Sequence, residues 1–178
     1  AYRDAVAELG VTSFEMPKVE ADDVIGTLAV KMAEVGSHTV ILSTDKIFLQ
    51  LLSDKIFVRD HFKQSYLDRA YVTQRFGVTP EKFVDFLALT GDNTNGIRGV
   101  PGVGPKTATK LIEDFGSLDG ILAATETTEG NDGSLALSMK MRDKLVDYAE
   151  DARQAQSLVR LQTDLVLSLN LKALRYKL

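Results

Sequence analysis

A run of glycine and proline between residues 91 and 107 constrains this chain more than any other feature. Five glycines and two prolines fall within these seventeen residues. Glycine loses the most conformational entropy when it is fixed in a helix, and proline lacks the amide hydrogen that a helix interior requires. The run therefore cannot be the interior of a helix, and it predicts a series of tight backbone turns.

Helical patterns lie on both sides of this run. Residues 79–81 (Thr-Pro-Glu) form a typical helix start, and Phe83, Phe86 and Leu87 then share one apolar face. A second helix is expected over residues 106–115, and it ends at the glycine that follows. The sequence therefore predicts a helix-hairpin-helix.

The chemistry of such a hairpin favours phosphate. Glycine permits positive φ and close backbone approach, so successive amide groups can point at one phosphate, assisted by the dipole of the following helix. Contacts to the sugar-phosphate chain position DNA without reading its sequence. The residues expected to contact duplex or branched DNA are Arg98, Gly99, Gly102, Gly104, Lys106, Thr107 and Lys110.

Two other interpretations of the hairpin stay open. The spacing from Gly99 to Gly104 fits the nucleotide-binding pattern G-x-x-x-x-G-K-[ST], but Pro105 is inserted before Lys106. That pattern should also follow a strand, whereas a helix and a polar loop precede this run. The second alternative is a tight turn between packed helices that binds no ligand.

The first half of the chain alternates helix and strand signals. Helices are expected over residues 2–9, 21–35 and 46–52, and strands over 39–42 and 55–58. In the second helix, an apolar stripe at helical spacing is formed by Ile25, Leu28, Ala29 and Met32. Strand, helix and strand at this spacing indicate a parallel α/β sheet.

From about residue 68 the sequence changes character, and the expected elements are helices as far as residue 161. These include helices over 135–148 and 151–161, after a polar loop over 125–134, and a strand-like tail follows over 164–169. The predicted fold class is thus α/β, with a parallel-sheet core in residues 1–75 and an all-helical subdomain in residues 76–178.

Acidic residues stand where a cation could be bound. Glu20, Asp22 and Asp23 lie at the start of a helix, Asp45 follows a strand, and Asp92 opens the glycine run. Ligands of α/β sheets gather outside the carboxyl ends of strands, and carboxylate oxygens suit Mg²⁺ or Mn²⁺. Each of these residues could instead serve as a helix cap or a turn residue. Their combination with a phosphate-binding hairpin favours a metal-dependent phosphodiesterase.

The composition of the chain excludes several classes of protein. The chain has 178 residues and no cysteine, which excludes disulfides and leaves no zinc pattern. No apolar run reaches the ~18 residues that would suggest a membrane span, so we expect a soluble cytoplasmic protein. The net charge of −4 argues against a protein that coats nucleic acid. It does not exclude DNA binding, because the charges of an acidic pocket and of a basic DNA-binding surface would cancel in the net charge.

Several segments, in order and spacing, resemble the 5′-nuclease family, which includes flap endonucleases. They are residues 19–25 (VEADDVI), 43–46 (STDK), 51–53 (LLS), 91–92 (GD) and 99–108 (GVPGVGPKTA). The end of the chain, over residues 152–169, is similar to the small stand-alone bacterial type. The resemblance implies a PIN-like α/β core followed by a helix-three-turn-helix.

The resemblance also implies site roles. It assigns Glu20, Asp22, Asp23, Asp45 and Asp92 to the acidic positions that bind Mg²⁺ or Mn²⁺. It further implies a K⁺ ion held by hairpin carbonyls, those of Val100 and Val103 with help from Ile97 or Asn95, which bridges to a DNA phosphate.

Three departures from the family pattern affect the catalytic hypothesis. Ile47 stands where the family has an aspartate two residues after Asp45, and Asn95 stands where it has one three residues after Asp92. Both losses belong to the second metal site. The family's N-terminal strand and helical arch are also not recognisable here, so we expect a fragment of a longer protein.

The leading hypothesis is a monomeric metal-dependent nuclease that acts near a 5′ end, flap or junction. Glu20, Asp22, Asp23 and Asp45 would hold the first metal, and Asp92 would lie toward the second. The alternative is a structure-specific DNA-binding module whose metal site is vestigial, and Ile47 and Asn95 favour it.

Overall fold

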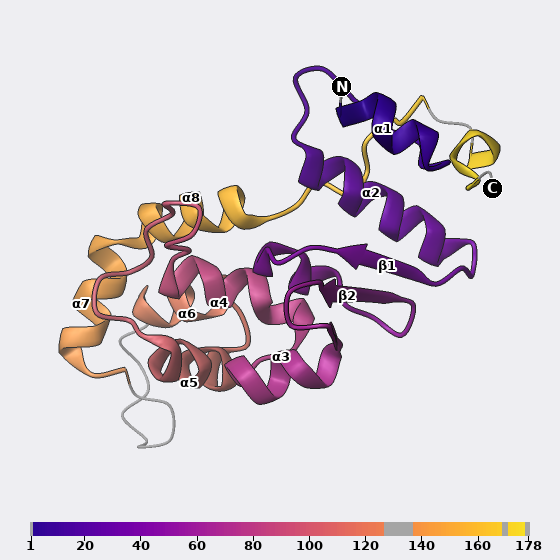
Figure 1. Ribbon diagram of the computed structural model, residues 1–178. Coiled ribbons are helices and arrows are strands. Elements are labelled where there is room, and N and C mark those ends of the chain that lie inside the picture. Colours follow the sequence, from indigo (N-terminus) through magenta and orange to yellow (C-terminus); the bar gives the residue numbers. More distant parts are fainter. Residues whose placement is uncertain (1, 127–136, 169–170, 177–178) are drawn as a thin grey trace.

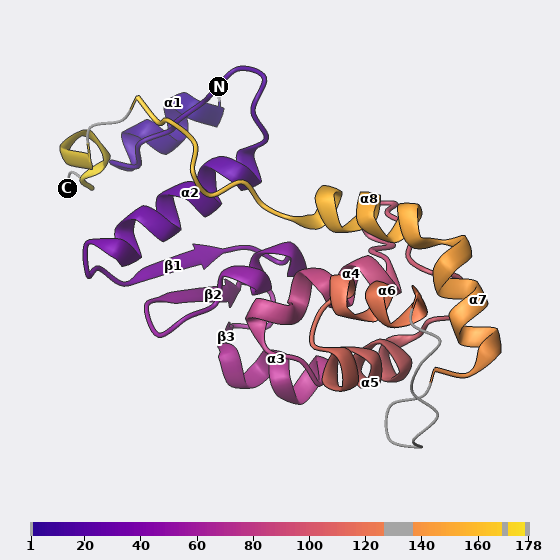
Figure 2. The same cartoon turned by 180° about the vertical axis from the view of Figure 1, so that it is seen from behind.

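In the computed structural model, residues 2–126, 137–168 and 171–176 are described. A three-stranded sheet lies between helix α2 on one side and helices α3 and α4 on the other, and further helices extend away from it (Figures 1 and 2). Over these described residues, no helix is long and apolar enough to span a membrane. The elements are α1 (Tyr2–Glu8), α2 (Ala21–Glu34), β1 (Thr39–Leu42), η1 (Lys46–Leu51), β2 (Ile56–Asp60), β3 (Ser65–Leu67), α3 (Arg69–Phe76), η2 (Pro80–Lys82), α4 (Phe83–Thr90), α5 (Pro105–Phe115), α6 (Leu118–Glu126), α7 (Met139–Asp147), α8 (Ala149–Val159) and η3 (Leu171–Leu174), where η marks a 3₁₀ helix.

The sheet has the order β1-β2-β3. Strands β1 and β2 are parallel, with Ile41 beside Val58, which confirms the expected parallel pair. Strand β3 is antiparallel to β2 and was not expected, because its three residues carry no apolar alternation. The turn between β2 and β3 is held by Asp60, whose Oδ1 accepts hydrogen bonds from the Phe62 and Lys63 amides at 3.1 Å each.

Helix α2 buries a face that differs from the expected stripe. Ile25, which belongs to that stripe, is 37% exposed, whereas Val24, Gly26 and Thr27 are buried with Ala29. The cause is the C-terminal segment, which lies along the helix. The Thr27 hydroxyl donates to the carbonyl of Gln162 at 3.2 Å, so the helix is rotated toward that chain.

Of the strand expected over residues 164–169, residues 164–168 form no strand, and residue 169 lies outside the described residues. Residues 162–168 show alternating burial, as an extended chain does, but they pair with no strand in the described part of the protein. Instead the Lys31 ammonium donates to the carbonyl of Leu165 at 2.8 Å. The alternation therefore arises from packing against α2 and not from a sheet.

Other helix boundaries shift by a few residues. Helix α7 begins at Met139 because the Ser138 hydroxyl accepts a hydrogen bond from the Met141 amide, while residues 135 and 136 of the expected helix lie outside the described part. Helix α8 starts two residues before its expected position. Of the loop expected over 125–134, Thr125 and Glu126 form the last turn of α6, with Thr125 buried, and residues 127–134 lie outside the described residues.

Helix α4 is enclosed on all sides. Its residues from Phe83 to Leu89 are all buried, beyond the single apolar face that the sequence predicts. Helices α5, α6 and α8 pack around it, together with η1 and η2. Its one buried acid, Asp85, accepts a hydrogen bond from the Gln156 amide of α8 at 2.6 Å. The helix therefore fixes where its neighbours lie.

The loop after α4 folds back onto the end of that helix. The backbones of Asp92 and Ile97 pair through two hydrogen bonds of 2.8 and 2.9 Å, and the Val100 amide donates to the carbonyl of Leu89 at 2.9 Å. Gly99 passes so close to Gly91 that a Cβ at position 99 would lie 2.3 Å from the Gly91 nitrogen. The expected helix-hairpin-helix is confirmed, and this crossing of two glycines closes it.

We predict that Gly99→Ala destabilises the protein by about 3 kcal/mol, because an added methyl group would meet backbone that cannot yield. Gly104→Ala is the matched control in the same loop. Gly104 has φ of −90° and open space around its Cβ position, so its change in stability should stay within about 0.5 kcal/mol. Urea unfolding measures both, and equal effects would contradict the proposed crossing.

An ion pair between α3 and η2 predicts a pH dependence. The hydrogen bond from Arg69 lowers the pKa of Glu81 to about 2. Because the folded pKa is depressed, the stabilisation is complete above about pH 4.5 and is lost as the pH falls toward 2. Glu81→Gln should therefore cost about 1 kcal/mol or less at pH 7, since the pair is exposed, and this cost should fall toward zero as the pH drops through 2. A difference in the free energy of unfolding that does not change with pH would refute this.

Candidate functional site

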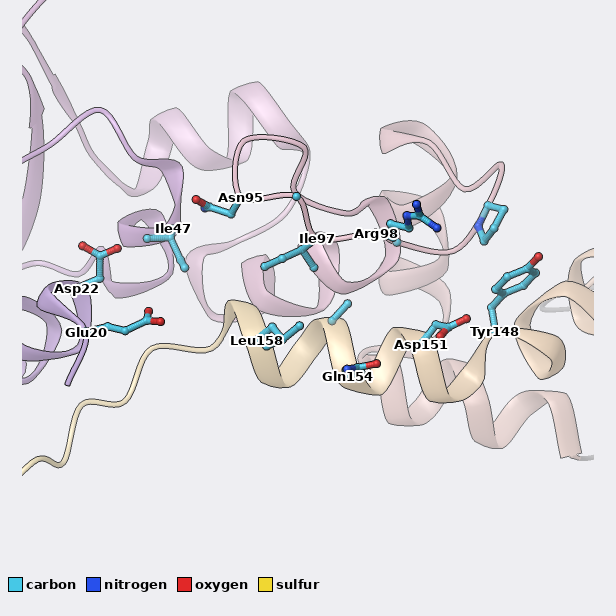
Figure 3. Close-up of a pocket in the computed structure, with 14 residues that line it drawn as sticks. Glu20, Asp22, Ile47, Asn95, Ile97, Arg98, Tyr148, Asp151, Gln154 and Leu158 are labelled. Carbon is cyan, nitrogen blue, oxygen red and sulfur yellow. The ribbon is translucent and has the colours of Figure 1, made fainter. Parts of the chain in front are cut away.

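A cavity of about 790 Å³ lies between the start of α2, the loop after α4 and helix α8. Figure 3 shows Glu20 and Asp22 at one end of it, Arg98 and Tyr148 at the other, and Ile97 between them. Its lining residues are Glu20, Asp22, Ile47, Asn95, Gly96, Ile97, Arg98, Gly99, Pro101, Tyr148, Asp151, Gln154, Ala155 and Leu158. One cavity thus joins the acidic start of α2 to the hairpin.

Four of the five predicted carboxylates gather at the acidic end. Glu20 is the N-cap residue of α2, and Asp22 lies in its first turn. Burial raises the pKa of Asp22, and the charges of Asp45, Glu20 and Asp23 raise it further. These groups are therefore close enough to repel one another, and a cation placed among them would relieve that repulsion.

Asp45 follows β1 and begins η1. Its Oδ1 accepts a hydrogen bond from the Ile47 amide at 2.9 Å, and its own amide donates to the Ser43 hydroxyl at 3.0 Å. These two bonds hold the carboxylate at the carboxyl end of the strand, as expected for a ligand site of an α/β sheet. Ile47 is buried and lines the cavity, so a hydrocarbon side chain stands beside the acidic end.

Asp23 has a structural partner. Its Oδ1 accepts a hydrogen bond from the Gln162 amide at 2.8 Å. Together with the contact of Thr27 to the same residue, this bond attaches the C-terminal segment to α2.

Asp92, the fifth predicted carboxylate, is held in an ion pair with Lys46. Its side chain is fully buried, and its Oδ1 is 3.0 Å from the Lys46 ammonium. Burial alone raises the pKa of Asp92, but the hydrogen bond and charge of Lys46, with bonds from Asn95 and Thr94, outweigh it and lower the pKa. The residue is therefore a buried anion with its own counterion.

The carboxylates do not form a closed metal cage. Within the described residues, no three Asp, Glu, His or Cys side chains form a group that could hold one metal ion. Mg²⁺ is commonly bound by only one or two carboxylates, and waters and substrate phosphates complete its shell. The carboxylate oxygens of Asp22 and Asp45 are ligands of the kind that such a partly hydrated Mg²⁺ ion requires.

Most of the hairpin residues that the sequence predicts to bind phosphate are exposed. Gly104 is the N-cap of α5 and makes no side-chain cap bond, and the space around its Cβ position is open. Lys106 and Lys110 are exposed on the first turns of that helix, and Arg98 is exposed within the cavity lining. Lys110 lies 3.6 Å from Asp114, and Thr107 is half-buried. The amide end of α5 is therefore accessible to an anion.

Two of the carbonyls expected to hold K⁺ already accept backbone hydrogen bonds within the turn. The carbonyl of Val100 accepts from the Val103 amide at 3.0 Å, and that of Ile97 accepts from the Asp92 amide. Both valine side chains are buried, while Asn95 is exposed. Each of the two bonded carbonyls keeps a second lone pair for another ligand.

Sequence reasoning did not identify several residues at the site. Tyr148, the residue between α7 and α8, lines the cavity together with Asp151 and Gln154 of α8. Nothing in their sequence pattern distinguishes these three residues from others nearby. Lys144 of α7 lies against the hairpin, because a Cβ on Gly102 would be 2.7 Å from its Nζ. These side chains come from helices that are distant in the sequence, so only the fold brings them to the hairpin.

Two family models together match the whole chain. The model for the 5′-3′ exonuclease N-terminal resolvase-like domain matches residues 1–77, and the model for the 5′-3′ exonuclease C-terminal SAM fold matches residues 78–178. Both models describe parts of the same exonuclease family.

Relatives in bacteria are longer than this chain. Flap endonuclease Xni of Aeromonas salmonicida is 46% identical over 174 residues, which cover 98% of this chain and 63% of the relative. Flap endonuclease Xni of Klebsiella pneumoniae is 40% identical over 176 residues, which cover 98% of this chain and 66% of the relative. The chain thus spans somewhat less than two thirds of the length of these relatives.

Solved structures show the same fold. The T5 5′-exonuclease is 26% identical with a TM-score of 0.71, over 84% of this chain and 58% of that one. A bacteriophage T5 flap endonuclease, in a pseudo-enzyme-product complex with DNA and metal ions, is 24% identical with a TM-score of 0.75, over 90% and 56%. The Rad2 catalytic core with DNA substrate is 16% identical with a TM-score of 0.58, over 92% and 55%.

The α/β class and the helical second part expected from the sequence are confirmed by these neighbours, and the family resemblance is confirmed by the two models. This chain belongs to the 5′-3′ exonuclease family.

Proposed function

We propose that the protein is a divalent-metal-dependent nuclease that cuts DNA near a 5′ end or a branch. The observation that carries this proposal is the single cavity that joins Glu20 and Asp22 to the hairpin. A nuclease needs both parts, a cluster of carboxylates for a cation and a grip for the phosphate backbone. Relatives named Flap endonuclease Xni and a T5 neighbour solved with DNA and metal ions support it.

The hairpin is proposed to hold the DNA backbone. The exposed amides at the start of α5 would donate to one phosphate, and the open space at Gly104 allows close approach. Lys106, Lys110 and Arg98 would neutralise neighbouring phosphates, and Gly99, Gly102 and Thr107 would shape the turn. Because these contacts meet only the backbone, binding would not depend on base sequence.

The acidic end is proposed to bind Mg²⁺ or Mn²⁺. Asp22 and Asp45, with Glu20 and Asp23 nearby, supply the carboxylate oxygens, and their mutual repulsion favours a bound cation. When bound, such a cation stabilises negative charge that develops on a phosphate. Asp45 is held for this purpose by its two backbone-linked hydrogen bonds.

A K⁺ ion in the hairpin is a further part of the proposal. The second lone pairs of the Val100 and Ile97 carbonyls, with the Val103 carbonyl and the Asn95 side chain, are oxygen donors on one turn. An ion held there would add positive charge beside the phosphate at the start of α5. We propose that the protein acts as a monomer.

We predict that Asp45→Asn lowers flap cleavage about 100-fold or more in the full-length protein with Mg²⁺. Asparagine can still accept the Ile47 amide bond, so the fold should be kept. Asp151→Asn is the matched control, because this carboxylate lines the same cavity on α8, away from the acidic end. A labelled 5′-flap duplex measures both, and equal cleavage by the two variants would refute the role of Asp45.

The DNA-binding module is the second candidate function. The lack of a three-carboxylate group among the described residues favours it, as do Ile47 and Asn95 beside the acidic end. Incubation with the labelled 5′-flap duplex and Mg²⁺ distinguishes the nuclease from the DNA-binding module. Tight flap binding with no Mg²⁺-dependent cleavage would establish the binding module and exclude the nuclease.

We predict that Lys106→Ala with Lys110→Ala weakens duplex binding and reduces its salt dependence. Each lost phosphate contact should lower the slope of log K against log salt by about 0.9, so the double variant should lose nearly 2. Lys63→Ala removes one charge at the turn between β2 and β3 and is the control. Fluorescence anisotropy over a salt series measures the slope. An unchanged slope in the double variant would show that the hairpin does not hold DNA.

A further inference from the structure

Lys46 and Asp92 form an ion pair that links the two parts of the fold. Lys46 is the first residue of η1, directly after Asp45, and Asp92 opens the loop that becomes the hairpin. The ammonium and Oδ1 are 3.0 Å apart. The lysine side chain is 32% exposed, whereas the aspartate side chain is fully buried. The pair therefore connects the acidic end to the hairpin across forty-six positions of sequence.

Both oxygens of the Asp92 carboxylate have partners. Oδ1 accepts from the Lys46 ammonium and from the Thr94 amide, each at 3.0 Å. Oδ2 accepts from the Asn95 side-chain amide at 3.0 Å. The backbone of Asp92 pairs in addition with that of Ile97. An ion that approached this carboxylate would have to displace groups of the protein itself.

The charge of Asp92 is already balanced. An ionised carboxylate without a partner is very unfavourable in the interior, so a buried one requires a counterion and hydrogen bonds. Lys46 supplies the counterion, and the Thr94 and Asn95 groups supply the bonds. A divalent cation bound at the same carboxylate would repel the ammonium at close range.

Residues next to the ion pair line the cavity. Ile47 follows Lys46, and Asn95 and Ile97 belong to the Asp92 loop, and all three line the cavity. The pair thus sets the separation of the carboxylate on Asp45 from the hairpin. Asn95, which replaces a family aspartate, donates to Asp92 where an aspartate would repel it.

We propose that Lys46 is the built-in cation of Asp92 and a positioning residue, which fixes the hairpin loop against Asp45, and that Asp92 does not bind a divalent cation. The positioning part rests on the proposed function, since the loop it places is the proposed DNA grip. The assignment of the charges does not depend on catalysis.

Counting bound Mn²⁺ tests the role of Asp92 directly. Electron paramagnetic resonance on the full-length protein should find the same number of bound Mn²⁺ ions in Asp92→Asn as in the unchanged protein. Asp45→Asn is the comparison that should lose Mn²⁺ affinity. A loss of one bound ion in Asp92→Asn would overturn the proposal. If the unchanged protein binds no Mn²⁺, the proposed function fails, and the charge assignment is decided by unfolding.

The unfolding equilibrium measures how much the Lys46–Asp92 ion pair stabilises the fold. Lys46→Met should raise the unfolding equilibrium constant about 100-fold, because it leaves a buried carboxylate without its counterion, and adding Asp92→Asn should recover most of that change. The exposed pair of Arg153 and Glu150, 2.9 Å apart, is the control and should show less than about a fivefold effect. An effect of Lys46→Met as small as that of the control would overturn the proposal. If Lys46→Met does not fold, the Mn²⁺ count on Asp92→Asn decides it.

A DNA-binding measurement distinguishes a positioning role of Lys46 from direct contact between Lys46 and the DNA. Lys46→Met should lower duplex affinity about tenfold without a change in the salt slope, because the ammonium meets Asp92 and not a phosphate. A slope smaller by about 1 would place Lys46 on the DNA, and an unchanged affinity would remove its positioning role. Either result would overturn the proposal.

Discussion

The enclosure of helix α4 is the constraint on which the rest of the structure depends. All residues from Phe83 to Leu89 are buried, so the helix must be covered by α5, α6 and α8 together with η1 and η2. Its last turn leads into the hairpin, and the Val100 amide returns to the carbonyl of Leu89. The hairpin is thus attached to a helix that is buried over almost its whole length. Helix α8, fixed by the bond from Gln156 to Asp85, forms the other wall of the cavity.

Charge is distributed unevenly along that cavity. Carboxylates that raise the pKa of Asp22 gather at one end, while Arg98 lies toward the other and Lys106 and Lys110 lie on the helix that follows the hairpin. This separation is consistent with the proposal that a chain with a net charge of −4 holds both a cation and a phosphate backbone. The Lys46–Asp92 pair lies between the two regions and balances its own charge. In the proposed nuclease, the DNA backbone would meet the basic side of the cavity and the bond to be cut would meet the acidic side.

Local patterns predicted the parts of the fold that local chemistry determines. The hairpin followed from its glycines, and β1 and Asp45 followed from a β-branched run with a polar end, because turn geometry and strand pairing depend on neighbouring residues. The buried face of α2 was wrong at Ile25, and the tail was not a strand, because both depend on a contact between segments more than 130 residues apart. For the same reason the sequence showed neither the pairing of Lys46 with Asp92 nor the approach of Lys144 to Gly102. The sequence identified Asp92 as a candidate site residue, but it did not predict that Lys46 is its partner.

A crystal structure of the full-length protein with a 5′-flap duplex and Mn²⁺ would show whether one cavity holds both the metal and the DNA. We predict an anomalous peak beside Asp22 and Asp45, and a phosphate of the same duplex at the amide end of α5. Lys46 should remain on Asp92, with no peak there. DNA bound on another face of the molecule, or metal at Asp92 with none at Asp45, would contradict the proposed site.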